Sequence, residues 1–123
     1  MGEVRYMIAF TIPGRLPDCN TFYRAQRYNQ GKTKRDADEL VAWCAKAARI
    51  KPIESPVRLH ITWYEQNAKR DHDNVSFGIK FVQDGLVKAG ILQDDGPRYV
   101  KGFSHDFEID RKNPRIEVEI IIV

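Results

Sequence analysis

Residues 57–64 read VRLHITWY, and this stretch decides the expected fold. Val57, Leu59, Ile61 and Trp63 fall on one face of an extended chain, because successive side chains of a strand point to opposite faces. Alternation of this kind predicts a half-buried β-strand. The other elements can be placed around this strand.

Three further stretches predict strands of the same sheet. Residues 4–12 (VRYMIAFTI) alternate in the same way, and Pro13-Gly14 ends them. Residues 115–122 (RIEVEIII) predict the last strand, and a short strand is expected near 98–104. The last strand is strongly apolar for a sheet edge, so we expect it to be paired, covered or in contact with another subunit.

Two helices are expected between these strands. The first begins at Thr33 and is stopped by Pro52. The second covers roughly 74–89, and Gly90 is a suitable residue to end it. Residues 15–32 show no clear period and predict a long loop, which is typical of function or mobility.

The resulting order, β-α-β-α-β-β, predicts an α/β fold in which both helices cover one mixed sheet. The length of 123 residues fits a single compact domain over 1–123, and 42% hydrophobic with 30% charged residues excludes a disordered or fibrous chain. No apolar run approaches the roughly 20 residues that cross a bilayer, and no signal peptide is recognisable. We therefore expect a cytoplasmic protein without a membrane partner, in which Cys19 and Cys44 are free thiols.

Positive charge is concentrated in one segment. Residues 13–36 carry a net charge of +4, whereas the rest of the chain carries −1. Bases interleaved with aromatic and amide side chains suit a phosphate backbone and unstacked bases, although a solvated surface loop has the same composition. The candidate DNA-binding residues of this segment are Arg15, Asn20, Tyr23, Arg24, Arg27, Lys32, Lys34 and Arg35.

Residues 69–74 read KRDHDN and hold the densest group of chemically active side chains. Asp71 and Asp73 point the same way in an extended approach to a helix. Two neighbouring carboxylates can hold Mg²⁺, and a third from Asp94 or Asp95 would complete the set of ligands. Such a metal polarises a phosphodiester and activates water, which indicates a hydrolytic site.

The same residues have a second interpretation. Asp and Asn are favoured at helix N-termini, and residues 94–97 (DDGP) are ordinary turn residues. In the catalytic interpretation, Lys69 and Arg70 would hold the phosphodiester beside the carboxylates. The residues alone leave both interpretations open.

Lys80 favours the catalytic interpretation. On a continuous second helix it shares one stripe with Asp73 and Asp84, and its side chain leans toward the helix N-terminus. The alternative is a surface ion pair between Lys80 and Asp84, which are spaced i,i+4.

The reach of the chain raises a geometric objection to a single metal site. A straight helix from Asp73 to Gly90 is about 25 Å long, whereas five residues from Gly90 to Asp95 span at most about 17 Å. The helix must therefore start later, near Gly78, or the two aspartates must lie back along the flank of the helix. Otherwise the third carboxylate comes from another subunit.

The remaining polar residues do not indicate a further catalytic or metal site. Asp106, Glu108 and Asp110 alternate and predict a solvated strand face. No pair of histidines has metal-ligand or triad spacing, and no serine elbow motif is present, so covalent nucleophilic catalysis has no support.

Taken together, these motifs resemble the RusA family of Holliday junction resolvases, small phage- and prophage-associated endonucleases. The resemblance covers nearly the whole chain. It rests on Asp71-His72-Asp73-Asn74, Lys80, the run Asp84-Gly85-Leu86-Val87-Lys88-Ala89-Gly90, Asp95, Gly14-Arg15-Leu16-Pro17 and Asn20.

The resemblance implies a compact α/β homodimer that acts on four-way junction DNA. It assigns Asp71, Asp73 and Asp95 to the metal and the catalytic site, with Asp94 as an alternative to Asp95, and Lys80 as the catalytic lysine. Seven positions separate Asp73 from Lys80, which is about one helical turn longer than in the best-known member; a subgroup from Gram-positive bacteria and their phages shares this spacing.

The expected activity is a Mg²⁺-dependent endonuclease, with Mn²⁺ as an alternative ion, that resolves four-way junctions by paired, symmetric nicks. Two other activities stay open. One is a metal-dependent nuclease that acts on flaps or forks, and the other is a DNA-binding module without catalysis.

Overall fold

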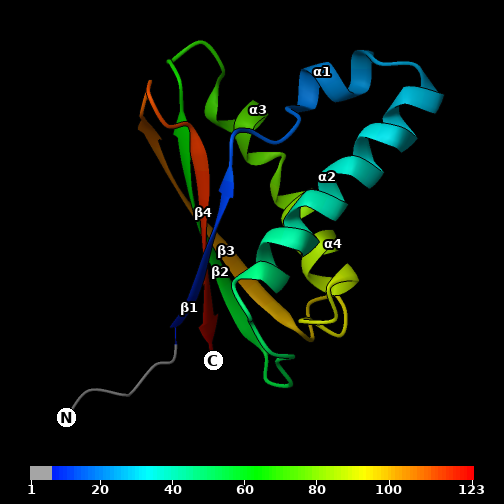
Figure 1. Ribbon diagram of the computed structural model, residues 1–123, viewed down its shortest axis with the longest axis vertical. Helices are drawn as coiled ribbons and strands as arrows, with labels where there is room; N and C mark the ends of the chain where they lie inside the picture. Colours follow the sequence, from blue (N-terminus) through cyan, green and yellow to red (C-terminus); the bar gives the residue numbers. More distant parts are fainter. Residues whose placement is uncertain (1–6) are drawn as a thin grey trace.

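A computed structural model describes residues 7–123, and its four strands form one mixed sheet in the order β1-β4-β2-β3 (Figure 1). β1 and β2 each pair antiparallel with β4, and β3 pairs parallel with β2. The strands are β1 (Met7–Pro13), β2 (Val57–Glu65), β3 (Val100–Ile109) and β4 (Arg115–Ile122).

The predicted α/β class and mixed sheet are confirmed. The strand expected at 115–122 has those bounds and lies inside the sheet, paired on both sides, which explains why it is apolar. The third strand begins at Val100 and runs on to Ile109, so it is longer than expected. Residues 4–6 of the first predicted strand lie outside the described residues.

The helices cover one face of the sheet (Figure 1). The first expected helix corresponds to α2, whereas the second is a pair of helices, α3 and α4, in the structure. The helices are α1 (Cys19–Arg24), α2 (Arg27–Ala47), α3 (His72–Ser76) and α4 (Ile79–Lys88). None of these helices is long and apolar enough for a bilayer crossing.

The long loop predicted at 15–32 is wrong, because most of this segment is helical. Asp18 caps α1 by accepting a hydrogen bond from the Thr21 backbone, and α2 then begins at Arg27 instead of Thr33. The first turns of α2 are mostly exposed, so they carry no apolar period by which a helix could be recognised. α2 ends at Ala47, ahead of Pro52, and Arg49 follows with a left-handed φ of 60°.

The helix predicted over 74–89 is interrupted between α3 and α4. Gly78 packs so closely against Trp63 that a Cβ at this position would lie 2.9 Å from the indole ring. The later start near Gly78 is therefore the observed one, and Asp73 belongs to a different helix from Lys80 and Asp84.

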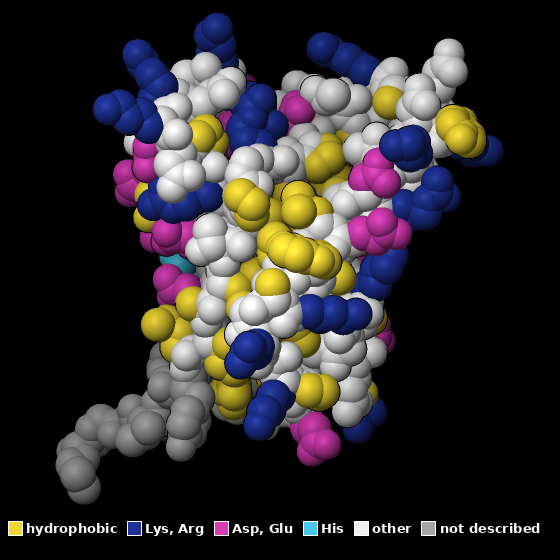
Figure 2. Space-filling model, viewed as in Figure 1, with side chains coloured by type: hydrophobic (Ala, Val, Ile, Leu, Met, Phe, Trp, Pro, Cys, Tyr) yellow, Lys and Arg dark blue, Asp and Glu magenta, His cyan; other side chains and the backbone are white. Residues whose placement is uncertain are grey.

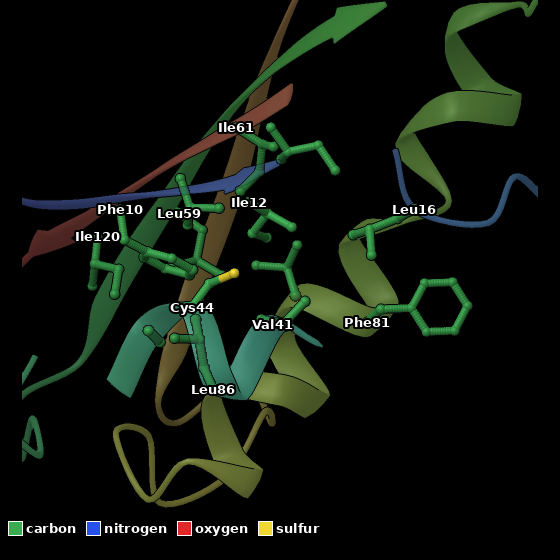
Figure 3. Packing of buried hydrophobic residues seen from close by; sticks show 14 of the residues in the cluster. Phe10, Ile12, Leu16, Val41, Cys44, Leu59, Ile61, Phe81, Leu86 and Ile120 are labelled. Carbon is green, nitrogen blue, oxygen red and sulfur yellow. The ribbon is translucent and has the colours of Figure 1, made fainter. Parts of the chain in front are cut away.

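The core lies between the sheet and the α2–α4 pair (Figure 3). Strands contribute Ile12, Leu59 and Ile61, and the helices contribute Val41 and Leu86, all of them fully or almost fully buried. This packing fixes the position of α4 and of the loop that follows it.

Gly85 is the closest point between α2 and α4, and we expect Gly85→Ala to destabilise the fold. A Cβ there would lie 2.5 Å from two Val41 side-chain atoms and 3.0 Å from the Asp38 carbonyl oxygen. Overpacking of this kind costs about 1–3 kcal/mol of unfolding free energy, measured by urea titration.

Gly31→Ala is the matched control, because Gly31 lies in α2 with open space where its Cβ would be. This substitution should stabilise the protein by about 0.5–1 kcal/mol through helix propensity alone. Equal effects of the two substitutions would contradict the close α2–α4 contact.

Candidate active site

Asp71 and Asp73 stand at the beginning of α3, and both are exposed. Asp71 occupies the N-cap position, but its side chain accepts no capping hydrogen bond. The carboxylate of Asp71 is therefore not used by its own helix, which weakens the interpretation of this residue as a mere cap. Asp73 lies in the first turn, where a carboxylate interacts favourably with the helix dipole.

A buried group of charges holds the chain just before these aspartates. The Arg70 guanidinium donates two hydrogen bonds to the Glu65 carboxylate, at 2.7 and 2.8 Å, and lies 3.5 Å from Asp18. The Arg70 and Glu65 side chains are only 16% and 11% exposed. Arg70 was predicted to bind DNA; in the structure its guanidinium is engaged with the Glu65 and Asp18 carboxylates, one residue before Asp71.

Asn74 and Asn20 join α3 to α1. The Asn20 backbone N–H donates to the Asn74 Oδ1 at 2.9 Å. Burial alone would raise the pKa of Asp18, but hydrogen bonds with Thr21 and Asn74 and the Arg70 charge outweigh it and lower that pKa. Asn20 therefore contributes a backbone contact that holds α1 against the segment with Asp71 and Asp73.

Asp95 lies in the loop after α4, beside Asp94 and Asp84. Hydrogen bonding with Asp94, then burial, then hydrogen bonding with Asp84 raise the pKa of Asp95. Charged carboxylates this close repel one another, and a divalent cation would relieve that repulsion. Asp84 was not among the predicted site residues, and its i,i+4 spacing from Lys80 was the signal that could have pointed to it.

Lys34 is the counter-ion of this acidic group. Its ammonium contacts Asp38 on α2 and lies 3.0 Å from Asp84 on α4. Burial lowers the pKa of Lys34, but hydrogen bonds with Asp38 and Asp84 outweigh this effect and raise the pKa. Lys34 was also predicted to bind DNA, and in the structure it is engaged between two helices.

Lys80 is exposed and has no ion-pair partner among residues 7–123. It lies one helical turn before Asp84 on α4, as predicted. The predicted stripe does not extend to Asp73, because the break at Gly78 changes the path of the chain.

The three predicted metal ligands do not meet within one chain. Over residues 7–123, no group of three or more His, Cys, Asp or Glu side chains is placed to hold one metal ion. Asp71 and Asp73 form one part of the candidate centre and Asp95 another. Carboxylate oxygens are ligands that suit Mg²⁺. That Asp71, Asp73 and Asp95 do not come together agrees with the expectation that the chain after Gly90 is too short to bring Asp95 to Asp73.

Basic side chains are spread over the face that Figure 2 shows, and several exposed ones lie on α1 and the beginning of α2. Arg24, Arg27 and Arg35 are exposed, and Tyr23 and Tyr28 have 64% and 77% of their surface accessible. Lys69 is exposed in the loop before α3. Two other predicted DNA-binding residues have acidic partners, because Lys32 pairs with Asp36 and Arg15 lies 3.8 Å from Glu65. This surface, called the α1–α2 basic surface below, combines charge with open aromatic rings.

A pocket of about 430 Å³ adjoins the aspartates. His72, between Asp71 and Asp73, stacks on Phe107 of β3 with ring centres 3.9 Å apart and planes within 2°. The stack ties the motif to the end of β3, a contact that sequence reasoning missed because it depends on the fold. The lining includes Glu65, Arg70, His72, Val75, Phe107 and Ile109.

A Ser-His-Asp row lies on the other face of the sheet, although no triad was expected. His60 on β2 contacts Ser104 through Nδ1, and its Nε2 lies 3.0 Å from Asp106. The row arises because parallel pairing sets β3 beside β2. Asp106 is 66% exposed on an open strand face, so we assign the row to holding β3 against β2.

Comparison with known proteins gives one family. The family model described as endodeoxyribonuclease RusA matches residues 13–121 of the chain. No curated protein matches it.

Proposed function

Because the chain belongs to the RusA endodeoxyribonuclease family, we propose that it resolves four-way DNA junctions by paired, symmetric, Mg²⁺-dependent nicks. The family match over residues 13–121 carries this proposal. The exposed, uncapped Asp71 carboxylate beside Asp73 supports it, since these groups are free to serve a ligand.

Asp71, Asp73 and Asp95 would hold the metal, with Asp94 as the alternative to Asp95. When bound, Mg²⁺ supplies a Lewis acid that polarises the phosphate and lowers the pKa of a bound water. Lys80 is an exposed cation on α4 and would stabilise the negative charge that develops on the phosphate. The buried ion pair of Arg70 and Glu65 would position the segment with Asp71 and Asp73.

A homodimer suits this activity. A four-way junction is roughly two-fold symmetric, so two symmetric nicks need two equivalent sites. Because one chain does not gather Asp71, Asp73 and Asp95, each site would be completed either by rearrangement on binding or by Asp95 of the partner subunit.

The test is cleavage of a labelled four-way junction, with linear duplex and flap substrates as controls, in Mg²⁺ and in EDTA. Paired nicks on the junction alone, lost in EDTA, are expected. Preferential cleavage of flaps would favour a different structure-selective nuclease. Binding in every metal without cleavage would leave a DNA-binding module.

The α1–α2 basic surface should bind the junction arms, and we expect Arg27→Glu to weaken binding roughly tenfold. Reversing the charge replaces a phosphate contact by repulsion and lowers the salt dependence of the dissociation constant. Binding is measured by fluorescence anisotropy in EDTA, so that cleavage does not interfere.

Lys51→Glu is the matched control, because Lys51 is exposed beyond the other end of α2. It changes the net charge equally, and its effect should stay within about twofold because it lies away from the phosphates. If both variants weaken binding alike, net charge and not this surface governs binding.

A further inference from the structure

Four rings form a column beside the candidate active site. His72 stacks on Phe107 with ring centres 3.9 Å apart. The next ring along β3 is His105, whose centre lies 6.3 Å from that of Phe107, with 26° between the planes. His105 in turn lies beside Trp63, at 6.1 Å and 21°. The column therefore runs from the buried Trp63 in the core to the exposed His72 at the surface.

The inner end of this column is held in place. The Trp63 indole N–H donates to Nδ1 of His105 at 3.0 Å, and Trp63 is only 2% exposed. Burial, and then the charge of His60, lowers the pKa of His105, so its ring stays neutral and keeps Nδ1 as an acceptor. A ring surface fixed in this way needs little ordering when a ligand binds.

The outer end of the column lines the pocket of about 430 Å³, a size that suits a small organic group. His72 and Phe107 contribute flat rings, and Ile109, 59% exposed, contributes an apolar side chain. Asn67 lines the same pocket, and its Oδ1 accepts a hydrogen bond from the Lys69 backbone at 3.0 Å. The Asn67 NH₂ group is left as a donor. Flat rings with a polar group at one side suit the face and the edge of a nucleobase.

We propose that this pocket binds one unpaired DNA base, which lies against the rings of His72 and Phe107 beside the scissile phosphate. His72 stands between Asp71 and Asp73 in the chain, so a phosphate held at these carboxylates brings its nucleotide next to the pocket. The inference rests on the proposed function, because it places cleavage at Asp71 and Asp73. It adds a binding site for a base.

The charges of the pocket favour a base over a phosphate. Within residues 7–123, Arg70 is the only lysine or arginine that lines it, and its guanidinium is engaged with Glu65 and Asp18. A phosphate in the pocket would find no free cation to neutralise it. A base carries no charge, and it can use the rings that the phosphate cannot.

The base must be unpaired, because paired bases show a protein only their edges in the grooves. A base inside continuous duplex would have to leave its partner and its stack, which costs free energy, and the cost is least where pairing is already lost. Such bases occur where strands exchange at a branch point. The pocket would therefore contribute to the preference for branched over linear DNA.

The test is a scan of four-way junctions in which each nucleotide next to the branch point is replaced, one at a time, by an abasic site. Binding is measured by fluorescence anisotropy in Ca²⁺, which takes oxygen ligands as Mg²⁺ does, and denaturing gels check that the DNA stays intact. At the position that the pocket takes, loss of the base should weaken binding about tenfold, as expected for one base stacked on aromatic rings. At the other positions the change should stay within about twofold.

Phe107→Leu should remove this dependence on the base. Leucine keeps an apolar side chain but has no ring, so the intact and the abasic junction should bind within about twofold of each other. Phe103→Leu is the matched control, because Phe103 lies on the same face of β3 and is 46% exposed, but does not line the pocket. It should keep the tenfold difference. Circular dichroism checks that both variants are folded.

A second measurement does not depend on a variant. A junction that carries 5-iodouracil at the same position should, on irradiation, cross-link to His72 or Phe107, as located by mass spectrometry. A cross-link to other residues would overturn the proposal, and so would equal base dependence in Phe107→Leu and Phe103→Leu. If no position depends on its base, and Phe107→Leu instead changes the sedimentation coefficient of the protein, the pocket is covered by protein and the base site is rejected.

These outcomes can be separated from the proposed function, because none of them requires cleavage. A protein that shows the base dependence but cuts no DNA in Mg²⁺ would uphold the base site and reject the nuclease. Paired cleavage of the junction with no dependence on any base at the branch point would do the reverse.

Discussion

Asp73→Asn is expected to reduce the rate of junction cleavage by at least about a thousand-fold, with the fold unchanged. The side chain is exposed in the first turn of α3, so its shape contributes little to packing. Asparagine keeps that shape but removes the charge that would hold Mg²⁺. Loss of metal-assisted charge stabilisation costs several kcal/mol of activation free energy, and each 1.4 kcal/mol is tenfold in rate. Single-turnover cleavage in Mg²⁺ measures the effect.

Asp36→Asn is the control for this prediction. Asp36 is another exposed aspartate, paired with Lys32 on α2, and its loss should change the rate by less than about threefold. Equal unfolding curves for all three proteins exclude an effect through stability. Asp73→Asn with wild-type cleavage would remove Asp73 from the active site.

The same assay separates Asp94 from Asp95. The carboxylate that holds the metal should behave like Asp73 when it is changed to Asn, and the other should not. The Asp94 side chain accepts a hydrogen bond from the Asp95 backbone at 2.8 Å, which is a turn contact that asparagine can keep. We therefore expect the larger loss at Asp95.

The strands were predictable because their alternation is local. Residues 57–64 and 115–122 repeat with a period of two, and the sheet keeps that pattern as buried and half-buried positions. The beginning of α2 was not predictable from periodicity, because its first turns face solvent. The break at Gly78 depends on Trp63, which lies on another element and is brought there only by the fold.

The candidate site could be proposed from the sequence as a set of residues but not as an arrangement. The neighbouring carboxylates Asp71 and Asp73 can be recognised in the sequence, and their role as metal ligands stays a prediction. The roles of Arg70 and Lys34 could not be recognised. In the sequence, each is a basic residue close to other basic residues. Their partners, Glu65 on β2 and Asp84 on α4, come close to them only in the folded chain.

Arg70→Met is expected to lower the free energy of unfolding by about 3 kcal/mol. The substitution keeps much of the side-chain volume but removes the two hydrogen bonds to Glu65 and the 3.5 Å contact with Asp18. Two buried carboxylates are then left without their main counter-charge, and breaking a buried ion pair costs about 3–5 kcal/mol. Arg15, 3.8 Å from Glu65, offsets part of the loss, so we expect the lower end. Urea unfolding measures the change.

The neighbouring Lys69 is the matched control for Arg70. Lys69 is exposed, so Lys69→Met should change stability by less than about 0.5 kcal/mol, although it removes the same charge one residue away. Adding Glu65→Met to Arg70→Met should recover part of the loss, because the pair then becomes apolar instead of half-charged. Arg70→Lys should lie between, since an ammonium cannot make the bidentate contact. If Arg70→Met and Lys69→Met unfold at the same urea concentration, the buried charge group does not hold the segment with Asp71 and Asp73, and Arg70 returns to the candidates for DNA contact.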